Sequence, residues 1–160
     1  MRPIAAILAD SGPMDLLSTF ARHLTARGVR VRGLIQQHDP DMQLVDVHSG
    51  RTYAITQNLG PDSEACRIDP AGFAEASMVL RAALAEPADL VIVNRFGKLE
   101  ACGAGLAAEM LAVMAEGVPL LTTLHAEVLE QWRHFTGDAG VLLPADLDAL
   151  HRWWDEVRQG

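Results

Sequence analysis

Residues 5–24 read AAILADSGPMDLLSTFARHL and give the first indication of the fold. An apolar strand over residues 4–8 leads into a turn of small residues at 11–13, and an amphipathic helix begins at about Met14. Apolar segments continue to alternate with helical patterns along the chain, which is typical of a parallel sheet covered by helices. The sequence therefore predicts an α/β fold with three layers, a mainly parallel sheet flanked by helices.

Apolar periodicity and turn residues set the expected elements. We expect strands at residues 4–9, 29–35, 89–94, 118–124 and 139–143, and helices at 14–27, 71–86, 100–116, 126–135 and 145–158. An inserted β-hairpin is expected over residues 42–56, around the HSG turn at 48–50. The polar stretch 57–69 is expected to be an irregular loop, and long loops in compact domains are often functional. Because no repeat or linker interrupts this pattern, residues 1–160 are predicted to form a single domain.

Composition narrows the class of protein. Of the 160 residues, 49% are hydrophobic and 21% are charged, which is typical of a globular domain with one core. The formal net charge of −8 argues against a nucleic-acid surface, where basic residues cluster. No apolar run approaches the roughly 20 residues of a membrane-spanning helix, and the N-terminus lacks a signal-peptide cleavage site. We therefore expect no nucleic-acid partner and no membrane span.

The cysteines indicate the compartment. Cys66 and Cys102 are too few for a disulfide framework and lack the spacing of metal ligands. A reducing, cytoplasmic setting and no bound metal are therefore expected. Arg67 beside Cys66 would lower the pKa of the thiol, but no His–Asp pair at a recognisable spacing supports a cysteine nucleophile. An anion contact by Arg67 is the better interpretation of this pair.

Four stretches occupy the position where a sheet of this kind binds ligands. In a parallel α/β sheet, ligands bind beyond the carboxyl ends of the strands, where helix N-termini converge. This rule selects ADSGPMD (9–15), NRFGKLE (94–100), TTLHAE (122–127) and the 57–69 loop.

ADSGPMD has the place of a phosphate-binding loop but lacks its chemistry. A Walker A motif, G-x-x-x-x-G-K-[ST], needs a lysine for the β- and γ-phosphates and a hydroxyl for Mg²⁺. Counted from the helix, those positions fall at residues 13–15, which are Pro, Met and Asp. Free N–H groups at the start of the helix still favour an anion, so Asp10, Ser11 and Gly12 remain candidate ligand-binding residues. An ordinary strand–turn–helix with Asp15 in the first helical turn is the alternative.

NRFGKLE is the more informative stretch. Lys98, the only lysine in the chain, follows Gly97 directly beyond a strand that is expected to be buried, and Arg95 stands nearby. At the ligand-binding edge, Lys98 and Arg95 are expected to contact an anion, with Gly97 beside them. The alternative is a surface arrangement of Lys98 and Glu100 that caps a helix.

Two neighbouring residues bear on catalysis. In P-loop enzymes, an Asp at the end of the corresponding strand holds Mg²⁺. That place is Asn94 here, a neutral amide, so bound Mg²⁺ is not expected and Asn94 is assigned to ligand binding. Glu100 is the candidate catalytic residue and would position water. Its alternative role is a carboxylate that stabilises the start of a helix.

TTLHAE adds hydroxyl groups to the same edge. Thr122 and Thr123 can hydrogen-bond an oxyanion, and Thr123 is included among the candidate ligand-binding residues. His125 could act near neutral pH, or serve as a structural cap at the start of a helix.

Tryptophans near the C-terminus bear on packing and assembly. Trp132 and Phe135 are expected to pack together in the core, because they lie three residues apart on one helical face. Trp153 and Trp154 are adjacent and therefore face different directions. We expect one of them to be exposed, where it could contribute to a homodimer contact.

In its order of elements, the chain resembles the small P-loop nucleoside-triphosphatases of the thermophile type. The segments LVDVHSGRTYAI, VNRFGKLE and GVPLLTTL carry this resemblance. Within that group, DLVIVNRFGKLEACGAGL, EACRIDP and QWRHFTG are similar to a bacterial domain family of unknown function that is often encoded beside molybdate-transport genes. The resemblance covers nearly the whole chain, and NRFGKLEA is its most specific segment. It implies a P-loop-type sheet and a molybdenum- or tungsten-related role.

The chain departs from the P-loop pattern at the positions that perform the chemistry. The lysine and hydroxyl are absent at residues 13–15, and Asn94 replaces the acid of the second motif. Little would then neutralise the charge on a transferring phosphoryl group, so magnesium-dependent hydrolysis is expected to be weak or lost.

Three hypotheses about function follow. The leading one is an accessory or regulatory protein that binds a small anionic ligand (a nucleotide, molybdate or tungstate) at the carboxyl edge of the sheet. The second is an active nucleoside-triphosphate hydrolase or transferase with a rearranged site, in which Lys98 replaces the missing lysine and Glu100 positions water. The third is a non-catalytic protein-interaction module whose pocket has closed.

Overall fold

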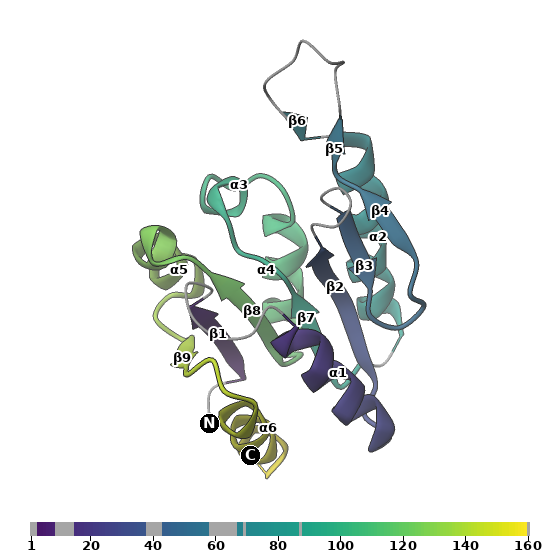
Figure 1. Ribbon diagram of the computed structural model, residues 1–160. Coiled ribbons are helices and arrows are strands. Elements are labelled where there is room, and N and C mark those ends of the chain that lie inside the picture. The colour runs from purple at the N-terminus through teal and green to yellow at the C-terminus, as the bar shows by residue number, and fades with distance from the viewer. Residues whose placement is uncertain are drawn as a thin grey trace.

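The main sheet confirms the predicted fold class. The computed structural model describes residues 3–8, 15–37, 43–57, 67–68, 70–86 and 88–159. Its seven-stranded sheet has the order β4-β3-β2-β7-β8-β1-β9 (Figure 1). The strands are β1 (Ile4–Leu8), β2 (Val31–Gln37), β3 (Gln43–Asp46), β4 (Thr52–Ala54), β7 (Leu90–Val93), β8 (Leu120–Leu124) and β9 (Val141–Leu143). The pairs from β2 to β9 are parallel, whereas β3 and β4 form an antiparallel hairpin on the edge of β2.

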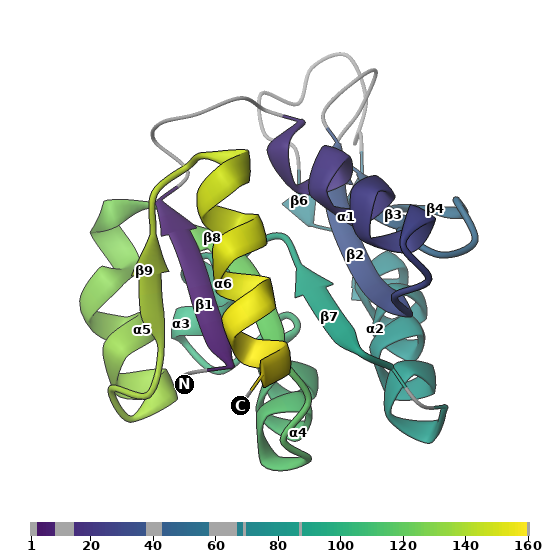
Figure 2. The same ribbon diagram turned by 90° about the horizontal axis from the view of Figure 1, so that it is seen from below.

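Helices cover both faces of this sheet. They are α1 (Leu16–Ala26), α2 (Pro70–Ala85), α3 (Lys98–Ala101), α4 (Ala107–Ala115), α5 (Leu129–Thr136) and α6 (Leu147–Gln159), with a 3₁₀ turn, η1 (Ala126–Val128), before α5. The helices α1 and α6 pack on one face, and α2, α4 and α5 pack on the other (Figure 2). The result is the three-layer arrangement that the alternation of elements predicts.

The central strand β7 is buried on both faces. Its residues Leu90–Val93 are 0% exposed. Val91 packs into the cluster under α2 and α4, and Ile92 packs into the cluster under α1 and α6. Each such side chain contributes ~1.5–3 kcal/mol of hydrophobic stabilisation. The end of β7 is therefore fixed by core packing on both faces, and this fixes where the residues after it begin.

Gly33 sets how closely β2 approaches β7. Its φ is +131°, and a Cβ built on it would lie 1.8 Å from the carbonyl oxygen of Ile92. The Gly33 carbonyl also accepts a hydrogen bond of 3.1 Å from the Val47 N–H, which follows the end of β3. Only a residue without a side chain fits between these strands in this conformation.

Two expected elements differ in the structure. The helix expected over 100–116 is divided into α3 and α4 by residues 102–106, where Gly103 and Gly105 have positive φ. The loop expected over 57–69 has paired ends, because β5 (Thr56–Gln57) and β6 (Arg67–Ile68) form a short antiparallel ladder. Positive φ at two glycines explains the first difference, and strand pairing at the ends of the expected loop explains the second.

The prediction that one of the two adjacent tryptophans near the C-terminus is exposed is wrong. Trp153 and Trp154 are both only 2% exposed, because both pack into the core cluster between α6, α1 and the sheet. The homodimer was expected on the basis of an exposed tryptophan, so it stays a prediction without that support. Trp132 is buried as expected and lies 6.2 Å from Phe135, measured between ring centroids.

No helix among the described residues is both long and apolar enough to cross a membrane. The same residues hold no cluster of three or more His, Cys, Asp or Glu side chains arranged to hold a metal ion.

Asp89 is expected to make folding sensitive to acid. Its carboxylate accepts the Arg30 backbone N–H at 2.8 Å and lies 3.5 Å from the Arg30 guanidinium. These contacts, the backbone hydrogen bond first, hold the pKa of Asp89 below its ordinary value of 3.8. The stabilising contribution of Asp89 is present above pH 3.8 and is lost as the pH falls through the lower, folded-state pKa.

The Asp89→Asn variant tests this expectation. In urea unfolding between about pH 5 and pH 3, wild type should lose more stability than Asp89→Asn, because the variant has no proton to take up at this position. Equal losses in the two proteins would show that the Asp89 contact does not contribute to acid unfolding.

Candidate functional site

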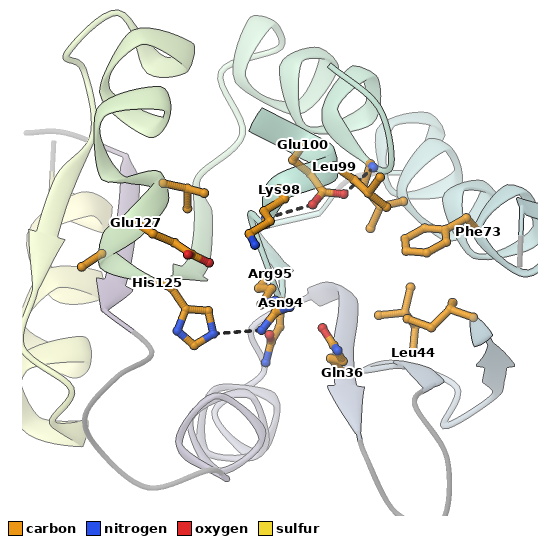
Figure 3. A pocket seen from close by; sticks show the side chains of 15 residues that line it. Gln36, Leu44, Phe73, Asn94, Arg95, Lys98, Leu99, Glu100, His125 and Glu127 are labelled. Atoms are coloured by element: carbon orange, nitrogen blue, oxygen red, sulfur yellow. Dashed lines mark hydrogen bonds between the residues drawn. The ribbon is translucent and has the colours of Figure 1, made fainter. Parts of the chain in front are cut away.

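A cavity of about 610 Å³ opens at the carboxyl edge of the sheet, where β2, β7 and β8 end (Figure 3). β2 contributes Gln36 to its lining, and the segment after β7 contributes Asn94 and Arg95. The segment after β8 contributes His125 and Glu127. A cavity of this size is within the usual range for small-molecule sites.

The loop between β7 and α3 is fixed to its neighbours through Phe96. The Phe96 N–H donates a hydrogen bond of 2.9 Å to the carbonyl of Thr123 on β8. Its ring is 0% exposed and packs 5.2 Å from Trp132 and 5.0 Å from Phe135, measured between ring centroids. This anchor leaves Arg95 and Lys98, on either side of it, in the lining of the cavity.

Arg95 is held by a histidine from the neighbouring strand end. One of its guanidinium nitrogens lies 2.9 Å from Nε2 of His125, and both side chains are half-buried (Figure 3). Arginine only donates hydrogen bonds, so Nε2 of His125 accepts this one and its proton is on Nδ1. The contact orients the guanidinium at the cavity wall.

Lys98 begins α3 and lines the cavity from its first turn. Its side chain is exposed, and its ammonium has no hydrogen-bond or ion-pair partner within the described part of the chain. Lys98 and Arg95 are therefore a pair of cations at one cavity, and neither forms an ion pair within the described residues.

Asn94 and the two threonines of β8 form a hydrogen-bonded group. The hydroxyl of Thr123 donates to Oδ1 of Asn94 at 3.1 Å, which leaves the amide N–H group of Asn94 to act as a donor. The hydroxyl of Thr122 is buried and donates to the carbonyl of Val93. The hydroxyl of Thr122 thus bonds within the sheet. The side chain of Asn94 lines the cavity, and the hydroxyl of Thr123 holds that side chain in place.

The Glu100 carboxylate ties the two ends of a turn together. It is only 6% exposed, and its two oxygens accept the N–H groups of Gly97 at 2.9 Å and Leu106 at 3.0 Å. Gly105 makes room for it, since a Cβ there would lie 1.9 Å from Oε2. These contacts give Glu100 a structural role at the start of α3. Its catalytic role stays a prediction.

The structure does not describe five of the residues that the sequence analysis considered, or describes only their backbone. Asp10, Ser11 and Gly12 lie outside the described residues, as does Cys66, and of Arg67 only the backbone, in β6, is described. β1 pairs with β8 up to the register Leu8–Leu124. The C-terminal end of β1 therefore lies at the same edge of the sheet as the cavity.

Several lining residues were missed by sequence reasoning. Gln36, Leu44, Phe73 and Glu127 come from β2, β3, α2 and η1. Their positions in the sequence carry no motif, and only the topology of the sheet brings them together. Glu127 lies within the stretch 122–127 that the rule for strand ends selected, although it was not singled out there, and Gln36 directly follows the predicted strand 29–35.

Three comparisons describe what the chain is similar to. The family described as "Protein of unknown function (DUF2478)" matches residues 4–153. The "Molybdenum import ATP-binding protein ModC 2" of Bradyrhizobium diazoefficiens is 37% identical over 165 residues, which cover 96% of this chain but only 18% of that protein. The crystal structure of THEP1 from the hyperthermophile Aquifex aeolicus superposes with a TM-score of 0.66 at 15% identity and covers 98% of this chain and 96% of that one.

Proposed function

The chain belongs to the family of proteins of unknown function DUF2478, as its motifs indicated, and from this premise we propose that it binds a small anion or a nucleotide in an accessory or regulatory role. Its α/β fold is similar to that of the THEP1 structure, which supports a fold of the P-loop type. The relative from Bradyrhizobium diazoefficiens is named for molybdenum import and ATP binding, which supports a nucleotide, molybdate or tungstate as the ligand.

One observation carries this proposal. Arg95 and Lys98 line one cavity at the carboxyl edge of the sheet, and the Lys98 ammonium has no partner within the described residues. Cations that converge on a cavity at this edge attract an anion, and the half-buried position of Arg95 strengthens its interaction by reducing solvent screening. Asn94 adds an amide donor beside them.

Asn94 and Glu100 fit a catalytic Mg²⁺ ion poorly. Mg²⁺ is held by carboxylates and substrate phosphates. The end of β7 offers the neutral amide of Asn94, whose Oδ1 accepts the Thr123 hydroxyl, and both oxygens of Glu100 accept backbone N–H groups. With Pro, Met and Asp at positions 13–15, the chain also lacks the phosphate-binding lysine at that point. We therefore propose that hydrolysis is weak or lost.

Lys98→Ala is expected to weaken anion binding about tenfold, because a hydrogen bond to a charged group contributes ~1.5–3 kcal/mol. Isothermal titration of wild type with ATP, GTP, molybdate and tungstate identifies the anion, and the variant is then titrated with it. Arg152→Ala removes an exposed cation of α6 that lies outside the cavity and serves as the matched control.

Failure of all four anions to bind wild type would reject the proposal. Release of phosphate from ATP above background, lost on Glu100→Gln in a protein that remains folded, would instead favour the hydrolase hypothesis.

A further inference from the structure

The cavity has two chemically different ends. Lys98, His125 and Glu127 gather at one end, and Leu44 and Phe73 stand at the other (Figure 3). Leu44 is among the buried apolar residues of the core, and its side chain forms part of the cavity wall. Phe73 is half-buried and packs against the same core cluster.

The apolar end is built by close contact between α2 and the hairpin. Gly72 of α2 lies so near Ala54 of β4 that a Cβ on it would be 1.8 Å from the Ala54 carbonyl oxygen. This approach puts Phe73, the next residue, beside Leu44 of β3 and Ile55 at the cavity. Leu99 of α3 adds a further half-buried apolar side chain to the lining.

An amide stands between the two ends. Gln36, at the end of β2, is half-buried, and its side chain has no hydrogen-bond partner within the described part of the chain. A side-chain amide offers a donor and an acceptor together, which is the pair that matches the edge of a heterocyclic base. An aliphatic chain would leave both groups of Gln36 without a partner.

The size of the cavity argues against a bare oxyanion. A tetrahedral oxyanion with four oxygens, each about as large as a water molecule of ~30 Å³, occupies on the order of 120 Å³. The cavity of about 610 Å³ is several times larger, and much of its wall is apolar. Small oxyanions are bound by surrounding donors, which the apolar end does not supply.

We infer that the ligand of this cavity is a heterocyclic organic anion of nucleotide size, with its ring against Phe73, Leu44 and Leu99 and its anionic group at Lys98 and Arg95. Gln36 contacts the edge of the ring. This inference rests on the proposed anion binding and adds the class of ligand. Molybdate, tungstate or inorganic phosphate would occupy only the part of the cavity beside Lys98 and Arg95 and would leave the apolar end empty.

Isothermal titration with the four ribonucleoside monophosphates, inorganic phosphate and molybdate tests the inference. At least one nucleotide is expected to bind wild type about tenfold or more tightly than either inorganic anion, since burial of a ring contributes affinity of that order. Phe73→Ala should weaken nucleotide binding by a similar factor and leave binding of the inorganic anions unchanged. Lys98→Ala should weaken both.

Two further variants keep the test decisive. Met78→Ala removes an apolar side chain from the same helix that is 58% exposed and lies outside the cavity, so it should bind as wild type does. Leu99→Ala removes ring contact without touching α2, and it replaces Phe73→Ala if that variant has lost its thermal unfolding transition.

Three outcomes would count against the inference. If molybdate or phosphate binds as tightly as every nucleotide, the inference is overturned while the proposed anion binding stands. If nucleotide binding is unchanged in a folded Phe73→Ala or Leu99→Ala, the ring does not lie at this end. If none of the six anions binds, the inference fails, whereas the proposed anion binding is rejected only if ATP, GTP and tungstate also fail to bind.

Discussion

Gly33→Ala is expected to lower the melting temperature by about 12 °C, the largest stability effect that we expect from a single substitution in this chain. The added methyl group would overlap the carbonyl oxygen of Ile92, and the φ of +131° is one that L-residues rarely adopt. Backbone strain and overpacking each cost ~1–3 kcal/mol, so a loss of about 4 kcal/mol is expected. For a domain of this length, 1 kcal/mol corresponds to about 2–4 °C.

Thermal unfolding followed by circular dichroism measures this effect, and Gly28→Ala is the matched control. Gly28 also has positive φ, +85°, but a Cβ there has no neighbour within 4 Å. The control should lose about 1 kcal/mol from backbone strain alone. Equal losses in the two variants would mean that β2 and β7 are not in the close contact described.

Glu100→Ala is expected to destabilise the fold by about 3 kcal/mol and to weaken ligand binding as well. Without the carboxylate, the N–H groups of Gly97 and Leu106 lose their acceptors, and each such loss costs ~1–3 kcal/mol where the group is buried. The same turn carries Lys98 at the start of α3. Loosening the turn therefore moves a cation of the cavity.

Glu109→Ala is the control for Glu100→Ala, because Glu109 is also buried but, among the residues that the structure describes, binds only the exposed side chain of Arg81, at 3.4 Å. It should lose about 1 kcal/mol. Chemical unfolding in urea gives both values. If Glu100→Ala unfolds at the same urea concentration as wild type, the carboxylate does not hold the turn together, and the catalytic hypothesis for Glu100 regains weight.

The parts of the structure that local pattern determines could be predicted from the sequence. The unbroken apolar run of β7 indicated a strand buried on both faces, and the HSG turn indicated the hairpin. Because the carboxyl ends of parallel strands share one edge, the same reasoning put Arg95 and Lys98 at a ligand edge, where both line the cavity. For these residues, the position in the sequence relative to a strand end or a turn was enough to predict the position in the fold.

The parts that depend on distant contacts could not be predicted. The helix expected over 100–116 is a local miss, since it is divided at Gly103 and Gly105, and helical periodicity carries no signal of the bond that Glu100 accepts from the N–H of Leu106 across this break. Phe73 and Leu44 meet because α2 packs on the hairpin at Gly72. Trp153 and Trp154 are both buried because α6 lies flat on the sheet, which adjacent positions on a helix do not reveal.

The hairpin β3–β4 lies at the rim of the sheet, and its Leu44 forms part of the cavity wall. The cations, by contrast, follow the central strand, whose replacement would disturb the whole core. Natural variation can therefore reshape the rim while the centre stays constant. Among relatives, we expect differences in the preferred ligand to accompany sequence changes in the hairpin. We expect binding of an anion to be retained wherever the cations that follow β7 are retained.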